Sequence, residues 1–362
     1  MDIAVPATPE VSIIVPARNE EVCLGDCLTS LGAQTAVAFE IIVVDDGSTD
    51  RTRAIAESFA GVRVVSPGAL PNGWTGKNNA VVAGAKEARG EWLLFTDADT
   101  VHLPGSLARA LAEAKENRAE LLSYSPEQIV VTFTEKVVMP VIFAELASQY
   151  PPAKVRDQSS GVVAANGQYI LVRRDAYESV GGHGAVADKI LEDVALARVF
   201  RVAGYRVYFR YGADAVRTRM YRNWHELREG WTKNLALLFP HPVRLAAGLF
   251  AWWAVAWLTV PLLIAGAALY LRVRRANFGR GATLLATAFG PPVVSYLLLR
   301  SVRAHRRGEV SWKGRVYSER ASARDFSRPS GTSSGMAFFP ALKRWANLGR
   351  PFGAGAGVGP KA

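Results

Sequence analysis

Cysteine is nearly absent from this sequence of 362 residues, which contains only Cys23 and Cys27. The two stand four residues apart in a stretch with helical periodicity, so we expect them on one face of a helix and infer no disulfide framework. With no neighbouring histidine and no further cysteine, the pair is also a weak metal-binding signal. The pattern favours buried or inert thiols and a reducing compartment.

Several signals of other protein classes are also missing. Residues 1–15 contain no basic stretch followed by an apolar one, so we expect no secretory signal. No strand-to-helix nucleophile elbow, no histidine cluster and no Gly-x-Gly-x-x-Gly turn occurs, so hydrolase, zinc and dehydrogenase chemistry lack support.

Acidic residues are scarce in the last third of the chain. From Arg244 onward the sequence holds 18 of its 43 Lys and Arg but only 3 of its 32 Asp and Glu, so the net charge is +15 there and −4 in residues 1–243. The basic residues flank long apolar runs and do not form a patch on a folded module, which argues against a nucleic-acid partner. A membrane surface is the better explanation.

Two of these apolar runs are long enough to be membrane segments. Residues 246–271 and 281–299 contain 26 and 19 consecutive residues without a charge. If both cross as a hairpin, the loop 272–280 with its four Arg lies opposite the first domain, against the rule that basic loops stay cytoplasmic. A bend at Pro261 that lets the first run enter and return is the alternative, and the sequence does not decide between them.

Short β-branched runs alternate with helix-period stretches in the rest of the chain, which predicts an α/β fold with a mostly parallel, doubly wound sheet. Strands are expected at 11–15, 40–44, 62–65, 92–96, 120–124, 166–172 and 205–209. Helices are expected at 20–32, 50–59, 77–88, 105–117 and 190–203. Residues 129–148 are apolar except for Glu135, Lys136 and Pro140, and the two central charges favour an interfacial helix over a spanning one.

This organisation predicts three parts. Residues 1–240 form the α/β domain, including the interfacial helix near 129–148. Residues 244–300 form a membrane region with the two apolar segments. Residues 301–362 form a basic, partly disordered tail, because serine, glycine and proline are frequent from 324 onward.

Two acidic pairs follow predicted strands. Asp45-Asp46 comes directly after EIIVV, and Asp97-Ala98-Asp99 directly after WLLFT. Carboxyl ends of strands in one α/β sheet converge on a single crevice, where ligands of such folds bind. In an extended segment Asp97 and Asp99 point the same way and could hold one hard cation. An ordinary turn for Asp45-Asp46 and a plain loop pair for Asp97 and Asp99 remain the alternatives.

The ordered series VSIIVPARNEE, IIVVDDGSTDRT and GKNNAVVAGAKEARGEWLLFTDADT resembles the inverting family 2 glycosyltransferases. The resemblance covers about residues 10–235 and implies their GT-A fold, a Rossmann-like domain for nucleotide-diphospho-sugars, here followed by membrane-embedded helices. PNGWTGKNNA at 71–80 and WKGRVY at 312–317 are more similar to the membrane subgroup that glycosylates carotenoid or hopanoid lipids.

The resemblance implies roles for individual residues. Asp97 and Asp99 match the Asp-x-Asp that binds ribose, diphosphate and a divalent metal, Mg²⁺ or Mn²⁺. The other implied nucleotide-sugar contacts are Pro16, Ala17, Glu20, Asp45 or Asp46, and Lys77. Asn166-Gly167 is similar to an acceptor-side segment of small residues, although a plain turn fits it equally well.

Glu192-Asp193 supplies the base that this reaction needs. An inverting transferase requires one group that removes the acceptor's hydroxyl proton as its oxygen attacks the anomeric carbon. We assign Asp193 as that base and Glu192 as a residue that orients the acceptor. Two solvated carboxylates that open a helix, where the dipole favours acids, are the alternative interpretation.

The sequence RTRMYRNW stands where family members often carry Gln/Arg-x-x-Arg-Trp. A guanidinium can grip a leaving diphosphate and an indole offers a flat wall, so Arg219, Arg222 and Trp224 are candidates for nucleotide-sugar binding. The spacing departs from the motif by one inserted residue, which puts the division of labour among the three in doubt. A basic juxtamembrane helix is the alternative.

Together these features predict a metal-dependent hexosyltransferase that moves a sugar from a UDP-sugar to a lipid at the cytoplasmic membrane face. A processive polysaccharide synthase is the alternative within the same enzyme class, although such synthases generally need more spans. A membrane-anchored nucleotide-sugar binder without catalysis is the alternative from another class. The sequence names neither the sugar nor the acceptor, because sugar contacts come from variable loops.

Overall fold

The computed structural model describes residues 8–258, 262–312 and 315–317. Its strands are β1 (Val11–Ala17), β2 (Phe39–Asp45), β3 (Val62–Val65), β4 (Trp92–Phe95), β5 (Thr100–His102), β6 (Leu121–Ser125), β7 (Glu127–Gln128), β8 (Ile170–Arg173), β9 (Val207–Tyr211), β10 (Val216–Thr218), β11 (Val310–Trp312) and β12 (Arg315–Tyr317). Its α-helices are α1 (Leu24–Gly32), α2 (Thr52–Glu57), α3 (Gly76–Glu87), α4 (Ser106–Glu116), α5 (Phe133–Gln149), α6 (Pro152–Arg156), α7 (Arg174–Ser179), α8 (Glu192–Val202), α9 (Trp224–Leu238), α10 (Pro242–Leu258), α11 (Leu262–Arg274) and α12 (Arg280–Arg307), and a 3-10 helix, η1, spans Gly182–Val186.

The main sheet has seven strands in the order β3-β2-β1-β4-β8-β6-β9. The pairs β3–β2, β2–β1, β1–β4 and β6–β9 are parallel. Strand β8 runs antiparallel to both of its neighbours, β4 and β6. The predicted mostly parallel sheet is therefore confirmed, with one reversed strand. A second sheet of three short strands, β5-β10-β7, lies beyond the ends of β4 and β6.

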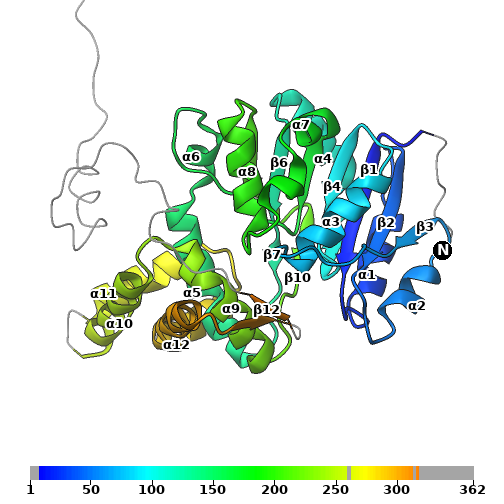
Figure 1. Cartoon of the computed structure of the whole chain (residues 1–362). Coiled ribbons are helices and arrows are strands. Elements are labelled where there is room, and N and C mark those ends of the chain that lie inside the picture. The colour runs from blue at the N-terminus through cyan, green and yellow to red at the C-terminus, as the bar shows by residue number, and fades with distance from the viewer. Residues whose placement is uncertain (1–7, 259–261, 313–314, 318–362) are drawn as a thin grey trace, which may run out of the picture. The chain divides into compact units, whose positions relative to one another are not determined.

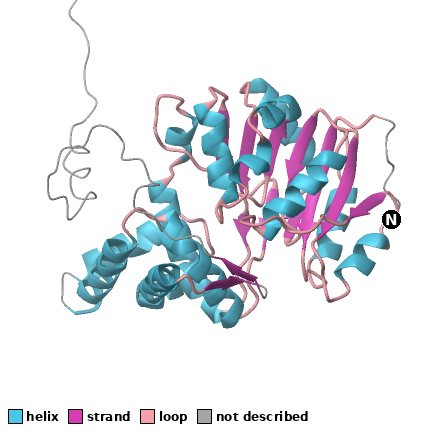
Figure 2. Ribbon diagram, in the orientation of Figure 1, coloured by secondary structure: helices cyan, strands magenta, loops and turns pink. Residues whose placement is uncertain are grey.

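Both faces of the main sheet are buried, as Figures 1 and 2 show. Ile13 and Val15 belong to a core with α1, α2 and α4, while Ile14 belongs to a second core with α3, α7 and α8. This is why the strands read as continuous apolar runs. Helix α3 approaches closely through its thin side, since a Cβ at Gly84 would come within 2.5 Å of Ile14 Cγ2.

Helices α5, α9, α10, α11 and α12 share a third core of their own. The interfacial stretch expected at 129–148 is helix α5, which begins with a capping box between Thr132 and Glu135. Glu135 is not a lipid-exposed charge. Its carboxylate is buried, accepts the backbone N–H groups of Val131 and Thr132, and pairs with Arg219 at 3.0 Å.

The segment expected at 246–271 is not one continuous helix in the described residues. It is divided between α10 and α11, which pack against each other, and the bend expected at Pro261 falls outside the described residues. Within the described ranges, one helix, α12, is long and apolar enough to cross a membrane, and α9 with α10, bent by 111°, would make a second if the pair were one span. Most of the tail expected at 301–362 lies outside the described residues.

Candidate active site

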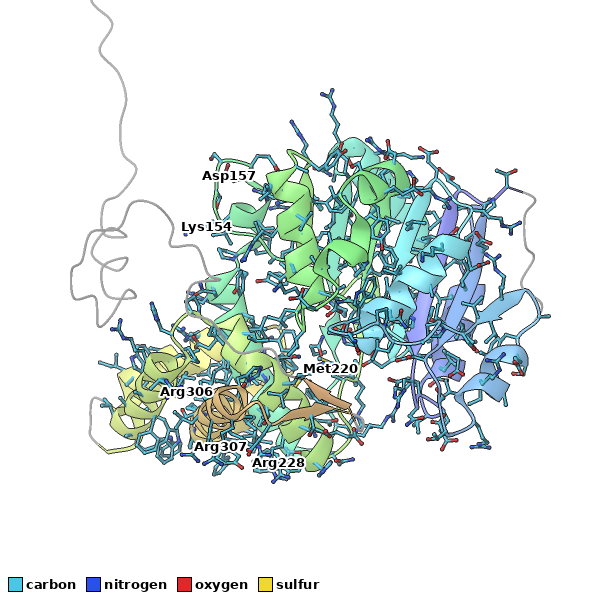
Figure 3. All side chains as sticks on the ribbon, viewed as in Figure 1. Lys154, Asp157, Met220, Arg228, Arg306 and Arg307 are labelled. Atoms are coloured by element: carbon cyan, nitrogen blue, oxygen red, sulfur yellow. The ribbon has the colours of Figure 1, made fainter. Side chains whose placement is uncertain are left out.

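A cavity of about 610 Å³ opens at the carboxyl ends of β1 and β4, the place where α/β sheets bind ligands. One wall comes from the sheet and from the start of α8, and the other from α5, α9 and the stretch that precedes α9. Met220, which Figure 3 labels, belongs to that stretch. Eleven of the thirteen residues expected at the site line it: Pro16, Ala17, Glu20, Asp46, Lys77, Asp97, Asp99, Glu192, Asp193, Arg219 and Arg222.

Lys77 joins the two acidic motifs at the centre of this cavity. Its Nζ lies 2.7 Å from Asp97 Oδ1 and 2.8 Å from Glu192 Oε1. Burial would lower the pKa of Lys77, but the charges of the two carboxylates outweigh burial and raise that pKa well above its ordinary value. The start of α3 is held in place because Asn78, on its first turn, donates to the carbonyls of Val186 and Ala187.

Glu192 and Asp193 open helix α8, where Glu192 is buried and Asp193 is partly buried. Glu192 is only 7% exposed; burial would raise its pKa, and the ammonium of Lys77 outweighs burial and lowers it. For Asp193, burial and then the neighbouring charge of Glu192 raise the pKa to about 6. The pair therefore contains one carboxylate kept ionised and one whose affinity for a proton is increased, an arrangement typical of acid–base sites.

Gly167 lies directly against this pair. Its N–H donates to Asp193 Oδ2 at 2.9 Å, and a Cβ at this position would come within 3.1 Å of Lys77 Nζ and 3.3 Å of Glu192 Oε1. The absence of a side chain lets the backbone reach the carboxylates. Asn166-Gly167 is a turn, since Tyr169 N–H donates to Asn166 O, and this turn also lines the cavity.

Two expected residues lie outside the cavity wall. Asp45 accepts the backbone N–H of Ser48 at 3.1 Å and is 3.7 Å from Arg53, so it stabilises the turn that was its alternative role. Because successive residues of a strand point to opposite sides, Asp46 faces the cavity instead. Trp224 is 36% exposed at the start of α9, with its ring centroid 6.5 Å from that of Tyr296.

The two arginines before α9 line the cavity, and the side chain of each contacts a neighbouring residue. Arg219 is held by the buried Glu135, and Arg222 Nη2 donates to Cys23 Sγ at 3.5 Å. Both cysteines are free thiols, as expected. Burial raises the pKa of Cys23, and it raises that of Cys27 to about 12, so neither is a reactive thiolate at neutral pH.

Two lining residues carry no signal in the sequence. Tyr150 ends α5 and donates its hydroxyl proton to Leu238 O at 2.7 Å, and Lys233 lies on α9. Both reach the cavity only because α5 and α9 pack beside the sheet. Neither belongs to a motif, so only the packing of these two helices could have revealed them.

The carboxylates fit a divalent cation in part. Among the described residues no three His, Cys, Asp or Glu are grouped closely enough to hold a metal alone. Asp97 and Asp99 do line one cavity, and Mg²⁺ or Mn²⁺ characteristically takes one or two carboxylates together with phosphate oxygens and water. The donor set therefore suits a cation that arrives with a diphosphate.

Part of the chain matches a known protein family. Residues 12–181 match the family described as "Glycosyl transferase family 2". The 4,4'-diaponeurosporenoate glycosyltransferase of Staphylococcus aureus strain MRSA252 is 28% identical over 343 residues, covering 85% of this chain and 88% of that protein. Its counterpart in strain USA300 is 30% identical over 234 residues, or 62% of this chain, and the match spans only 60% of that protein's length.

Solved structures with a similar fold have lower sequence identity to this chain. A mannosyltransferase from Pyrobaculum calidifontis, solved in complex with GDP-Man and Mn²⁺, is 20% identical with a TM-score of 0.49, over 84% of this chain and 89% of that one. Glucosyl-3-phosphoglycerate synthase from Mycobacterium tuberculosis is 21% identical with a TM-score of 0.44, over 64% and 78%.

Proposed function

We infer the function of this chain from the family to which it belongs, glycosyltransferase family 2. We propose that it transfers a hexose from a UDP-sugar to the hydroxyl or carboxylate of a membrane lipid, with inversion at the anomeric carbon. The observation that carries this proposal is the meeting of Lys77, Asp97, Glu192 and Asp193 in one cavity. The relatives named for diaponeurosporenoate support a lipid as the acceptor.

In this proposal Asp193 acts as the general base. As the acceptor oxygen attacks the anomeric carbon, its proton passes to a carboxylate oxygen of Asp193, and the bond from that carbon to the diphosphate breaks. The Gly167 N–H holds Asp193 Oδ2 and so fixes the orientation of the carboxylate. Glu192, kept ionised by Lys77, orients the acceptor beside it.

The donor end of the cavity is proposed to hold the nucleotide diphosphate. Pro16, Ala17, Glu20 and Asp46 would contact the base and ribose, and Arg222 the diphosphate. Asp97 and Asp99 would hold Mg²⁺ or Mn²⁺, which supplies positive charge against the leaving diphosphate when bound. Lys77 keeps a second positive charge beside Asp97.

A direct test exposes the detergent-purified protein to a panel of UDP-sugars together with a native lipid extract. Mass spectrometry should find one lipid that gains a single hexose. Products with many sugars would instead indicate a polysaccharide synthase. UDP binding by calorimetry without any product from any extract would indicate a binding protein.

The contacts of α10 and α11 support a hairpin that enters the membrane and returns on the same side. The chain enters α10 just after Leu238, whose carbonyl bonds to Tyr150 at the end of α5. The hairpin returns at Arg272, whose guanidinium grips Glu145 of α5 at 2.7 and 2.6 Å. Both ends thus lie at the carboxyl end of α5, and large apolar side chains are exposed between them: Phe250, Val255, Trp257, Leu263 and Ile264.

The contacts near the two ends of α12 support a helix that lies along the interface. Phe278, just before α12, packs on Phe143, and Ser301, near its end, accepts the N–H of Ala236. These partners lie in the carboxyl halves of α5 and α9, which the Tyr150 hydroxyl joins. We therefore propose that the basic segments 272–280 and 300–320 both stay on the cytoplasmic side.

This topology predicts one-sided labelling. A membrane-impermeant maleimide should modify a cysteine placed at Arg275 in inside-out vesicles and leave it unmodified in intact cells, because the hairpin returns to the cytoplasmic side. The background is a chain with both native cysteines replaced by alanine. Labelling from the outside of intact cells would contradict the re-entrant arrangement.

The raised pKa of Asp193 predicts the pH dependence of transfer. Below its pKa of about 6 the carboxyl is protonated and cannot accept the acceptor's proton, so kcat/KM should fall about tenfold for each pH unit below 6 and level off above it. Rates with a hydroxyl acceptor between pH 4.5 and pH 8 test this.

Glu192→Gln is the informative companion variant. The charge of Glu192 contributes to the raised pKa of Asp193, so its removal should move the inflection to lower pH. An inflection that stays in place, or moves upward, would show that a group other than Asp193 controls the profile.

A further inference from the structure

A second, larger cavity lies on the other side of helix α8. Its volume is about 1050 Å³, and its walls are α8, the segment from Ser179 to Lys189, the corner between α9 and α10, and the end of α12. Its lining is mostly apolar. None of the described lining residues is Asp or Glu. The charged side chains of the lining are all basic: Lys189, Arg198, Arg244 and Arg306, of which Arg306 is labelled in Figure 3.

Helix α8 has an apolar stripe on the side that faces this cavity. Leu196, Ala197 and Phe200 fill the sheet-facing core, as expected for a helix on an α/β sheet. The residues that line the cavity follow the helical repeat on another side: Leu191, Val194, Ala195, Arg198, Val199 and Val202. Val202 is 84% exposed, and Ala195 and Val199 are only partly buried against that core, so the core covers this side of the helix only in part. A helix with a second apolar side needs a second apolar partner.

The opposite wall is also apolar. The corner between α9 and α10 contributes five consecutive residues from Ala236 to Pro240, and Pro242 and Val243 continue it. Val243 and Arg244 are exposed at the start of α10, the helix that we place in the membrane. The cavity therefore has one end at the proposed membrane surface.

The other end of the cavity meets the active site. Four residues line both cavities: Tyr150, Leu191, Val194 and Leu238. Leu191 and Val194 stand immediately before and after Glu192-Asp193 in the sequence, and the bond from the Tyr150 hydroxyl to Leu238 O crosses the boundary. We call these four residues the neck.

We propose that this second cavity holds the apolar chain of the acceptor, whose reactive end passes the neck to Asp193. The ligand class is an amphiphile with a long hydrocarbon chain, and Arg244 and Arg306 face the anionic headgroups of the surrounding bilayer at the cavity's outer end. The inference rests on the proposed function, because it assigns that reaction's acceptor to a place. The four lining residues that this cavity shares with the active site favour the acceptor over a structural phospholipid.

The test uses the full chain in nanodiscs and a fatty alcohol that carries a diazirine at its chain end. After irradiation, adducts should map to α8 between Val194 and Val202 and to the corner from Ala236 to Pro240. Val199→Trp should fill the cavity and reduce this labelling at least about fivefold, since bulk replaces the space for the chain. The same variant should raise KM for the lipid acceptor at least about tenfold with unchanged affinity for UDP.

Two further variants keep the test decisive. Val202→Glu places a charge on a largely exposed position of the stripe and should fold normally, yet weaken labelling and raise KM in the same way. Ala112→Trp, on the exposed side of α4, adds the same indole far from the cavity and should change neither measurement.

The outcomes separate the inference from the proposed function. Unchanged labelling and KM in both cavity variants would place the acceptor chain elsewhere, and labelling only by a diazirine-bearing anionic phospholipid would make the cavity a phospholipid site. Either result overturns the inference while transfer itself persists. Normal labelling without transfer to any lipid would overturn the proposed function.

Discussion

Replacing Asp193 with asparagine is expected to lower kcat with a hydroxyl acceptor by about 10²- to 10⁴-fold, the usual contribution of a general base. The asparagine amide can still accept the Gly167 N–H through its oxygen, so the turn beside it should keep its place. It cannot take up a proton at neutral pH. Single-turnover rates with saturating donor separate this loss from any change in binding.

Asp188→Asn is the matched control, because Asp188 is an exposed carboxylate in the segment just before α8 and pairs with its neighbour Lys189 at 3.0 Å. It should leave kcat unchanged. UDP binding should be the same in both variants and in the unsubstituted chain. A D193N enzyme that retains near-normal kcat would remove Asp193 as the base and would point to an acceptor that is already ionised.

Replacing Asp99 with asparagine is expected to abolish detectable transfer and to remove the metal dependence of UDP binding. Mg²⁺ and Mn²⁺ prefer charged oxygen ligands, and an amide oxygen supplies no charge to hold them. Titration of UDP into the protein with and without Mn²⁺ gives a readout besides activity. The unsubstituted chain should bind UDP more tightly with the metal, and the variant should bind it equally with and without.

Asp97 need not behave in the same way, because Lys77 already occupies one of its oxygens. Asp97→Asn would remove both a cation ligand and half of the lysine's ion pairing, so it should also lower the thermal stability of the site.

Metal-dependent UDP binding that survives D99N would show that the cation is held elsewhere.

The sheet could be predicted from sequence because its strands are buried on both faces and therefore carry uninterrupted apolar runs. Together with the family match, the observed mixed sheet confirms the predicted GT-A class. The strand expected at 166–172 begins only at Ile170, since Asn166 turns the chain first. The three strands of the small sheet have two or three residues each, too few for any periodicity to show.

The packing of helices α5 and α9 to α12 was harder to predict, because hydropathy does not record where the chain turns back. A run of 26 uncharged residues is compatible with one span or with a hairpin. The contact that favours the hairpin is the ion pair between Arg272 and Glu145, which are more than a hundred residues apart in the sequence. In the same way, Glu135 looked like an obstacle to burial until Arg219 and the helix cap supplied its partners.

The candidate site also contains features that local sequence motifs reveal and features that depend on contacts between distant segments. Residues within motifs, such as Asp97 and Glu192, could be predicted to share one cavity because each motif follows or opens an element at that edge of the sheet. The bridge that Lys77 makes between them could not be predicted, since it joins α3 to two distant segments. Trp224 fits a motif, but it opens α9 beside Tyr296 of α12 and lies outside the cavity wall, a position that the sequence does not indicate.

The apolar lining of the second cavity bears on what it takes to remove a lipid from a bilayer. Exposing hydrocarbon to water costs about 0.8 kcal/mol for each CH₂, so a tail of about ten carbons would cost about 8 kcal/mol. At 1.4 kcal/mol for each factor of ten, that penalty is about six powers of ten in an equilibrium constant. A tail that slides sideways from the membrane into an apolar cavity avoids it. Acceptor affinity should then vary little with tail length until the tail is longer than the cavity. The glycosylated product can return to the leaflet by the same route, without exposing its tail to water.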